Sequence, residues 1–211
     1  MKVIVGLGNP GDKYLKTRHN AGEFYLSKLR NVWSEKDFTE GKNALWLETR
    51  VGKSRPEGGT PTSLSKNKKN ASGEKVFLIF PAEMMNNSGT SLKKIMTQLK
   101  IKPKPADILV IHDDLDIELG RIKISFARSS GGHNGVESVI KNLKTNKFWR
   151  LRIGIGLPRA KSRGKKLIDF ILKKFSPNEE RILNKNFKRV LEGLETWLVN
   201  PARAMSELNR N

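Results

Sequence analysis

The sequence contains no cysteine, only three histidines, and 21 acidic residues against 41 Lys or Arg. The absence of cysteine excludes disulfides, thiolate zinc sites and a cysteine nucleophile, and it agrees with a reducing cytoplasm. The shortage of acidic residues leaves a formal net charge of +20. This surplus exceeds what solubility requires and is typical of proteins that bind a polyanion. Nucleic acid is therefore the first candidate partner.

Long apolar runs are also absent. The apolar run at the N-terminus, within residues 1–8, is too short for a signal peptide or a membrane span. We therefore expect a cytoplasmic protein with no membrane partner. At 211 residues and 36% apolar content, the chain is long enough to close one sizeable core, so one compact domain is expected.

Apolar periodicity predicts strands that alternate with helices. Apolar runs and apolar residues at every second position predict strands, whereas apolar residues spaced three and four apart predict helices. The expected strands are 2–7, 44–51, 75–80, 108–111, 122–126 and 151–157, and the expected helices begin near residues 20, 89, 135 and 177. This alternation indicates an α/β fold, here a single domain with a mixed twisted sheet surrounded by helices.

Two segments stand outside this pattern. Residues 52–74 are rich in Gly, Ser, Pro, Asn and Lys and lack periodicity, which predicts a mobile insertion between two strands. The last expected helix ends near residue 199. We therefore place one domain at residues 1–199, with the insertion at about 52–74, and a C-terminal tail at residues 200–211.

The glycine-rich turn Gly6-Leu7-Gly8-Asn9-Pro10-Gly11 has the spacing of a dinucleotide-binding turn. In dinucleotide-binding proteins a helix opens directly after the turn, and an acidic residue follows about twenty residues later. Here a polar stretch follows the turn, and Asn31 stands at the later position. A tight turn from which Asn9 projects is therefore the better interpretation.

The three histidines, His19, His112 and His133, all lie in polar loops beside Asn or Asp. One such histidine is more often a hydrogen-bonded structural residue than a catalytic one. Hydrolysis, however, needs an imidazole that accepts a proton from water near neutral pH and a carboxylate that holds its tautomer. His19 and Asp113 can supply both.

The cluster His112, Asp113, Asp114 and Asp116 offers another chemistry, because imidazoles and carboxylates can hold Mg²⁺ or Mn²⁺ in a metal-dependent nuclease. While the strand continues, Asp113 points to the opposite face from His112 and Asp114. This alternation disfavours a shared ion. We expect no metal and no other cofactor.

Three side-chain amides, Asn9, Asn86 and Asn134, each fall in a glycine-flanked turn between a strand and a helix. One such amide is usually a turn residue. Three that converge suit a carbonyl substrate, because amides donate to a developing oxyanion without adding charge. Since there is neither a cysteine nor a serine in a nucleophile elbow, water is the expected nucleophile.

Basic residues are concentrated late in the chain, where residues 144–189 hold 15 Lys or Arg against three acidic residues. A solvated surface explains only part of such an imbalance. Contacts to phosphates are the natural use, and the lack of an RNP-type aromatic motif favours recognition by shape. An RNA-binding protein without catalysis would explain this charge, but it would leave His19, Asp113 and the three amides unused.

Six ordered blocks together resemble the bacterial-type peptidyl-tRNA hydrolases over residues 1 to about 190. The blocks are Gly6-Leu7-Gly8-Asn9-Pro10-Gly11 with Tyr14, Thr17-Arg18-His19-Asn20-Ala21-Gly22, Met85-Asn86-Asn87-Ser88-Gly89, His112-Asp113-Asp114-Leu115-Asp116, Gly131-Gly132-His133-Asn134-Gly135 and Arg150-Leu151-Arg152-Ile153-Gly154-Ile155-Gly156. The resemblance implies a monomeric α/β enzyme that cleaves the ester between a peptide and the 3′ ribose of tRNA. It also implies that no metal, cofactor or obligate protein partner is needed.

The resemblance assigns roles to individual residues by motif position. His19 would be the base that activates water, and Asp113 would hold it. Asn9, Asn86 and Asn134 would place substrate and water, and Asn9 would also help to distinguish blocked from free aminoacyl-tRNA. Tyr14 matches a tyrosine that contacts the substrate.

Two positions depart from the family pattern. Met84, expected beside the end of the tRNA, stands where the family usually has tyrosine. Ser125 stands where the family has a lysine that grips the tRNA 5′-phosphate together with the arginine that matches Arg152. We expect Arg152, helped by Arg128 or Lys123, to hold that phosphate in this chain.

Overall fold

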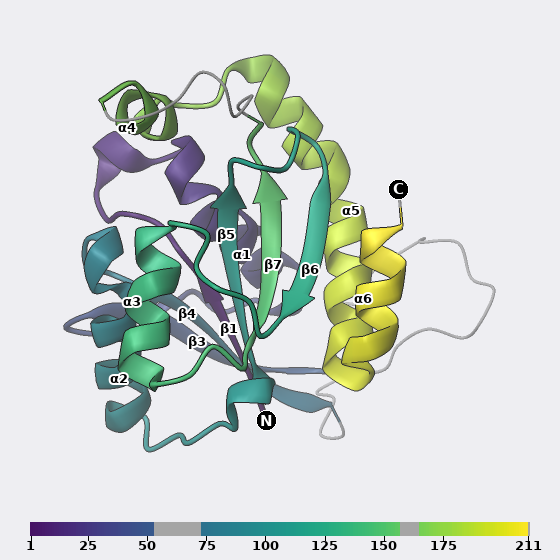
Figure 1. Ribbon diagram of the computed structural model, residues 1–211. Coiled ribbons are helices and arrows are strands. Elements are labelled where there is room, and N and C mark those ends of the chain that lie inside the picture. Colours follow the sequence, from purple (N-terminus) through teal and green to yellow (C-terminus); the bar gives the residue numbers. More distant parts are fainter. Residues whose placement is uncertain (53–72, 157–164, 211) are drawn as a thin grey trace.

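In the computed structural model, which describes residues 1–52, 73–156 and 165–210, one seven-stranded sheet has the order β2-β3-β4-β1-β5-β7-β6 (Figure 1). The strands are β1 (Lys2–Gly6), β2 (Thr39–Glu40), β3 (Ala44–Val51), β4 (Glu74–Pro81), β5 (Ile108–Asp114), β6 (Ile122–Phe126) and β7 (Trp149–Gly154). β4, β1, β5 and β7 run parallel, whereas β2, β3 and β6 pair antiparallel with their neighbours. The predicted mixed sheet is confirmed.

Helices cover both faces of this sheet (Figure 1). The α-helices are α1 (Ala21–Trp33), α2 (Ser88–Gln98), α3 (Asn134–Leu143), α4 (Lys165–Leu172), α5 (Pro177–Val199) and α6 (Pro201–Asn209). The short 3-10 helices are η1 (Asp12–Tyr14), η2 (Arg18–Asn20), η3 (Met85–Asn87) and η4 (Pro105–Asp107). In the described part of the chain, none of the helices has the length and apolarity to cross a bilayer.

The alternation of side chains along the central strands builds two apolar cores. On β1, Ile4 belongs to the core that packs against α1, α5 and α6, while Val3 and Val5 belong to the core that packs against α2 and α3. All three side chains are fully buried. Burial on both faces explains why β1 and β5 read as nearly continuous apolar runs.

The carboxyl ends of β1 and β5 lie at one edge of the sheet, and Gly22 holds the start of α1 against them. A Cβ on Gly22 would lie 2.2 Å from the carbonyl oxygen of Ile111 and 2.5 Å from the backbone nitrogen of Leu7. Only glycine permits this close approach. It places η2, which carries His19, directly beside the end of β5.

Most predicted elements are found, and the differences concern β2, β7 and the two helices α4 and α6. β7 begins at Trp149 and ends at Gly154, earlier than the predicted strand 151–157, and α4 and the two-residue β2 were not predicted. The predicted insertion at 52–74 lies outside the described residues except at its ends. Within the predicted tail, residues 201–209 form α6, which packs on α5 and β6, and Ala204 and Leu208 are buried in the core.

Candidate active site

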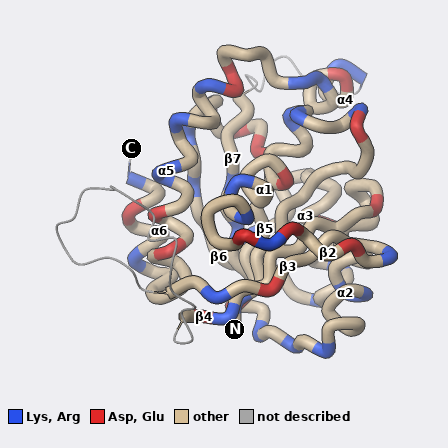
Figure 2. The backbone as a smooth tube through the Cα atoms, turned by 180° about the vertical axis from the view of Figure 1, so that it is seen from behind, with Lys and Arg blue, Asp and Glu red and all other residues tan. Residues whose placement is uncertain are grey.

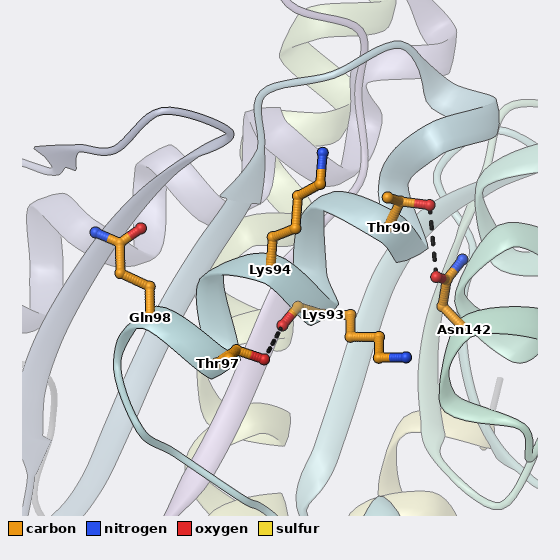
Figure 3. Close-up of a pocket in the computed structure, with 6 residues that line it drawn as sticks. All are labelled: Thr90, Lys93, Lys94, Thr97, Gln98 and Asn142. Carbon is orange, nitrogen blue, oxygen red and sulfur yellow. Dashed lines mark hydrogen bonds between the residues drawn. The ribbon is translucent and has the colours of Figure 1, made fainter.

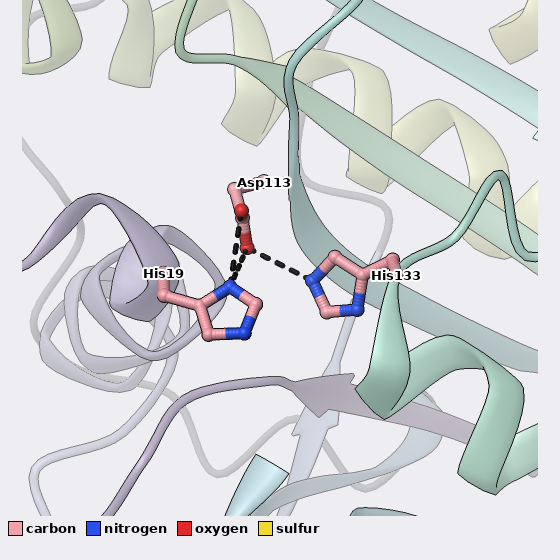
Figure 4. A group of neighbouring side chains, drawn as sticks. All are labelled: His19, Asp113 and His133. Atoms are coloured by element: carbon pink, nitrogen blue, oxygen red, sulfur yellow. Dashed lines mark hydrogen bonds and ion pairs between the residues drawn. The ribbon is translucent and has the colours of Figure 1, made fainter. Parts of the chain in front are cut away.

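Asp113, at the end of β5, lies between two imidazoles (Figure 4). His19 Nδ1 lies 3.0 and 3.1 Å from the two carboxylate oxygens of Asp113, and His133 Nε2 lies 2.9 Å from Oδ1. Asp113 is 3% exposed and His19 is 7% exposed. The two residues that the sequence proposed as base and carboxylate are therefore in direct contact, and a second histidine joins them.

The tautomer of His133 follows from its place at the N-terminus of α3. His133 Nδ1 accepts hydrogen bonds from the backbone N–H groups of Gly135 and Val136, at 3.1 and 3.3 Å. A nitrogen that accepts from two N–H groups carries no proton, so the ring proton is on Nε2, which donates to Asp113. The start of α3 thus fixes His133 as a hydrogen-bond donor to the carboxylate.

His19 contacts Asp113 through Nδ1, whereas His133 does so through Nε2, and this leaves Nε2 of His19 free to accept a proton. Its Nδ1–H donates to Asp113, so in the neutral ring Nε2 carries a lone pair. Burial lowers the pKa of His19, but the charge of Asp113 and its hydrogen bond outweigh this effect, and the net pKa lies above the ordinary value of 6.5. A pKa raised in this way makes His19 a better proton acceptor than a free imidazole.

Asp113 remains ionised although it is buried. Burial raises the pKa of a carboxyl group, yet the electrostatic interactions and hydrogen bonds with the imidazoles of His19 and His133 hold the pKa of Asp113 well below its usual range. The carboxylate is therefore available to stabilise a positive charge on His19.

His112 contacts the main chain of Asp113 and the ring of His133. Its Nδ1 donates to the main-chain oxygen of Asp113 at 2.6 Å, and its ring stands nearly perpendicular to that of His133, with ring centres 4.8 Å apart. Burial and then the neighbouring His133 lower the pKa of His112 well below its ordinary value, so it stays neutral. His112 therefore packs under the site and does not compete with His19 as a base.

Asn9 is fixed by Asn20 and by η3. The side chain of Asn20 accepts from the backbone nitrogen of Asn9 and donates to its carbonyl oxygen, both at 2.9 Å. Asn9 Oδ1 accepts from the backbone nitrogen of Met85 at 2.7 Å. The oxygen of the Asn9 amide is thus occupied, and its NH₂ group is left to act as a donor.

The other predicted contact residues lie on the turns around this centre. Asn86 in η3 and Asn134 at the start of α3 are exposed, and Met84, just before η3, is 45% exposed. η3 packs against the start of α3. Tyr14 is partly buried in η1, on the loop that joins Asn9 to His19. No bond joins Asn86 or Asn134 to His19 among the described residues.

Arg152 lies on β7, on the sheet face opposite to the side chains of Leu151 and Ile153, as its strand position predicts. Its Nε donates to Asp114 Oδ2 at 2.8 Å. Lys123 on β6 is the register partner of Arg152, whereas Ser125 is the register partner of Arg150. Of the two predicted helpers, Lys123 is therefore the direct strand neighbour of Arg152.

Arg150 is a further residue of this region to which the sequence analysis gave no role of its own. It is 2% exposed, and its Nη1 donates to the carbonyl oxygen of Ser129 at 2.6 Å, while Nε and Nη2 have no partner among the described residues. Burial, followed by the charges of Arg152 and Arg128, lowers the pKa of Arg150 to about 10. The three arginines therefore create a locally positive potential, which Asp114 partly offsets.

The metal-binding cluster considered from the sequence does not assemble. Asp113 points away from Asp114, which pairs with Arg152. The ligand atoms that do come together belong to His19, Asp113 and His133, all within 4.8 Å of one another. Because His133 Nδ1 already accepts from α3, its Nε2 must keep its proton and has no lone pair for an ion. This donor set suits hydrogen bonding better than metal ligation.

Positive charge is spread widely over the surface. Figure 2 shows lysines and arginines along α5, at α4 and along α2. A hollow of about 550 Å³ lies between α2 and α3 and is lined by Thr90, Lys93, Lys94, Thr97, Gln98 and Asn142 (Figure 3). It lies toward the C-terminal part of α3, whereas His133 caps the N-terminal end. This hollow is therefore separate from the histidine site.

Two further residues were missed because their signals are weak in sequence. Asn20 was interpreted only as a helix start, and nothing in its spacing from Asn9 indicates paired side-chain to main-chain bonds. His133 was noted as one of three histidines, and the glycine after Asn134 marks a helix start. A side chain directly before a helix can cap it by accepting hydrogen bonds from its first N–H groups. The position of His133 before the helix was therefore a signal that one of its ring nitrogens is an acceptor.

Comparisons with known proteins agree with the resemblance seen in the sequence. The family model described as peptidyl-tRNA hydrolase matches residues 3–211. A peptidyl-tRNA hydrolase of Aquifex aeolicus (strain VF5) is 35% identical over 211 residues, which cover 100% of this chain and 97% of the relative. One from Symbiobacterium thermophilum is 40% identical over 197 residues, which cover 93% of this chain and 92% of the relative.

The fold gives the same result. The crystal structure of peptidyl-tRNA hydrolase from Acinetobacter baumannii matches with a TM-score of 0.79 and 29% identity, covering 99% of this chain and 94% of that one. Sequence and fold are thus similar over almost the full length of the chain. The chain therefore belongs to the peptidyl-tRNA hydrolase family.

Proposed function

We propose that His19 is the general base with which this enzyme, a hydrolase of the ester bond of peptidyl-tRNA, activates water. The observation that carries the proposal is the direction of the hydrogen bond between His19 and Asp113: Nδ1 is the donor, so Nε2 is the nitrogen left to accept a proton. The raised pKa of His19 keeps proton uptake accessible near neutral pH.

The reaction then needs no group beyond water and the side chains of the site. Water attacks the ester carbonyl while His19 Nε2 takes one of its protons, and the carbonyl π electrons move to oxygen. Asp113 stabilises the imidazolium that results. When the tetrahedral intermediate collapses, the bond to the ribose oxygen breaks and His19 returns its proton to that oxygen. The peptide leaves with a new carboxyl group and the tRNA with a free 3′ ribose.

Asn9 supplies a neutral donor at this centre. Its amide oxygen is held by Met85 and its backbone by Asn20, so its NH₂ group points in a fixed direction. A preorganised donor lowers the energy of a developing oxyanion. The same NH₂ group can donate to the carbonyl oxygen of the peptide bond next to the ester. Free aminoacyl-tRNA has an amine there and no such carbonyl, so Asn9 helps to distinguish the two substrates.

The exposed side chains around the centre place the substrate. Asn86 and Asn134 hold substrate and water through their amides, and Tyr14 and Met84 contact the end of the tRNA. The exposure of Met84 and of both amides on neighbouring turns supports these roles.

Arg152 binds the tRNA 5′-phosphate, with Lys123 beside it as the second positive charge. Their Cα atoms are register partners on neighbouring strands. Arg150 and Arg128 add to the local positive potential without needing to touch the phosphate. We also expect the protein to act as a cytoplasmic monomer with no obligate protein partner.

An assay of a blocked aminoacyl-tRNA with and without EDTA tests the proposal. Imidazole catalysis predicts that the rate of ester cleavage is unchanged by the chelator, because no step passes through a metal. If EDTA inhibits fully and added Mg²⁺ or Mn²⁺ restores the rate, a metal ion activates the water and the proposal is wrong. Binding of tRNA without any cleavage would instead support an RNA-binding protein without catalysis.

A further inference from the structure

Arg18 directly precedes His19 and is one of the most deeply buried charged side chains described. Its side chain is 7% exposed. Nη1 donates to the main-chain oxygens of Lys173 and Lys174, at 3.1 and 3.2 Å, and Nη2 donates to both carboxylate oxygens of Glu179, at 2.7 and 2.9 Å. All four bonds reach the junction between α4 and α5.

The aromatic side chains of the same junction enclose the guanidinium. Its central carbon lies 4.4 Å from the ring centre of Phe170 and 5.5 Å from that of Phe175. Contacts of this kind between a guanidinium and an aromatic face are attractive and strengthen when water is excluded. Arg18 is thus held by hydrogen bonds and ring contacts together.

The main chains of the two segments are also paired. The backbone nitrogen of Arg18 donates to Lys173 at 3.2 Å, and that of Phe175 donates to Lys16 at 2.9 Å. Thr17 and Lys174 form an isolated antiparallel bridge. The turn that carries His19 is therefore attached to the α4–α5 junction by both backbone and side chain.

Glu179 connects this attachment to the start of α5. It occupies position N3 of the capping box that begins at Ser176, and its Oε2 accepts from the backbone nitrogen of Ser176 at 2.7 Å. One carboxylate thus caps α5 and receives Arg18. The position of the first turn of α5 consequently helps to fix where the guanidinium of Arg18 lies.

α4 is the least buried of the six α-helices, and Arg18 is one of its contacts. Among its described residues α4 has none that is buried, and it packs on η2, the element that carries Arg18 and His19, and through Phe170 and Ile171 on the core. Ile168 and Leu172 on α4 are 53% and 36% exposed. The contact between Phe170 and Arg18 is therefore one of the contacts that hold this helix in place.

We propose that Arg18 is a positioning residue for His19, which couples the placement of α4 to the direction of the His19 ring. The proposal rests on the assignment of His19 as the base. Asp113 fixes the imidazole through Nδ1, whereas Arg18 fixes the main chain from which the side chain of His19 departs. A small rotation of η2 would turn His19 Nε2 away from the water without breaking the core.

The test compares kcat, KM and melting temperature for Arg18→Gln, Arg18→Lys and Glu179→Gln, well below the melting temperature of each. We expect Arg18→Gln to lower kcat about 10- to 100-fold, since misplacement of a catalytic group by about 1 Å has effects of this size. Arg18→Lys keeps the charge but loses the fork and should recover part of the rate. Glu179→Gln keeps the capping box and removes only the charge pairing.

Lys16→Gln is the matched control. Lys16 pairs with Glu180 at 3.0 Å across the same two segments, but its side chain is 59% exposed. We expect its kcat to stay within about twofold of wild type, because exposed pairs contribute little. The kcat of the double variant Arg18→Gln/Glu179→Gln should lie within about twofold of the kcat of Arg18→Gln. Both substitutions remove the same interaction, so their effects should not add.

The outcomes separate this inference from the assignment of the base. If Arg18→Gln lowers the melting temperature while kcat stays near that of wild type, Arg18 is only a stabilising residue and the inference is wrong. If Arg18→Gln does not fold, the same comparison of kcat with melting temperature is made for Arg18→Lys and Glu179→Gln, and a kcat near that of wild type in both overturns the inference. Near-normal turnover by His19→Ala would overturn the base assignment itself.

Discussion

Replacing Asp113 by asparagine removes one charge from a site in which that charge is bound by two imidazoles. The substitution leaves the shape of the side chain almost unchanged. His133 is a fixed donor because α3 occupies its other nitrogen, so the amide oxygen of the introduced asparagine must face it. The amide NH₂ then takes the position of Oδ2, which lies 3.1 Å from His19 Nδ1.

The expected loss follows from the hydrogen bond that is weakened. A hydrogen bond to a charged group contributes about 1.5–3 kcal/mol. At about 1.36 kcal/mol for each factor of ten, removal of the charge predicts a fall in kcat/KM of about 10- to 150-fold. The amide oxygen at the position of Oδ1 still lies 3.0 Å from Nδ1, but the new NH₂ group beside it weakens the preference for the Nδ1–H tautomer, which increases the loss. It should still be smaller than the loss in His19→Ala, because the base itself remains.

The pH profile gives the sharper readout. In the wild type the pKa of His19 lies above 6.5 because Asp113 outweighs burial, so activity should fall as the pH drops through a value above 6.5. In Asp113→Asn only burial remains as a large influence, and it lowers the pKa. The acid limb should therefore move to lower pH. An acid limb that stays in place, or a loss greater than that of His19→Ala, would refute the reasoning.

Three other predictions concern tRNA binding and the support of Asn9. Arg152→Ala should raise KM for 5′-phosphorylated peptidyl-tRNA with kcat nearly unchanged, and removal of the 5′-phosphate should erase most of the difference from wild type; equal weakening of both substrates would contradict the clamp. Binding of tRNA should weaken at least about tenfold between about 50 and 200 mM salt, as measured by titration, and a flat profile would show the charges to be solvated surface only. Asn20→Ala should lower the free energy of unfolding in urea by about 1–3 kcal/mol, because it leaves the buried backbone of Asn9 unpaired, and should lower kcat/KM as well. Unchanged stability and activity in Asn20→Ala would contradict the support proposed for Asn9.

Much of the fold could be predicted because burial leaves a direct pattern in the sequence. β1 and β5 lie in the middle of the sheet, so both of their faces are apolar and they stand out as apolar runs. α5 was predicted from Ser176-Pro177-Asn178-Glu179, and the capping box is present. These signals depend on neighbours in the chain and need no tertiary contact.

The missed elements have a physical explanation. β2 has two exposed residues, which is too few for a periodic signal. For α6 a signal was available, because Asn200 caps the helix by accepting from the backbone nitrogen of Arg203, and Pro201 takes the first helical position. Its short apolar face is buried only because α5 and β6 lie beside it.

For the site, too, the chemistry of single residues could be predicted from the sequence, whereas contacts between distant segments could not. The chemistry of His19 with Asp113 could be named from residue types, but their contact joins residues 94 positions apart. The role of His133 depends on which of its nitrogens α3 occupies, and that of Arg18 depends on the α4–α5 junction. Both are properties of packing between distant segments, so local patterns do not indicate them.

Single-turnover hydrolysis of a blocked aminoacyl-tRNA by folded His19→Ala, measured with its affinity for tRNA, tests the central claim most directly. Loss of a general base lowers the rate about 100- to 10,000-fold. The account predicts a loss in that range while tRNA affinity stays within about twofold of wild type, because the basic residues are untouched. Cleavage at a near-normal rate by the folded variant would contradict it.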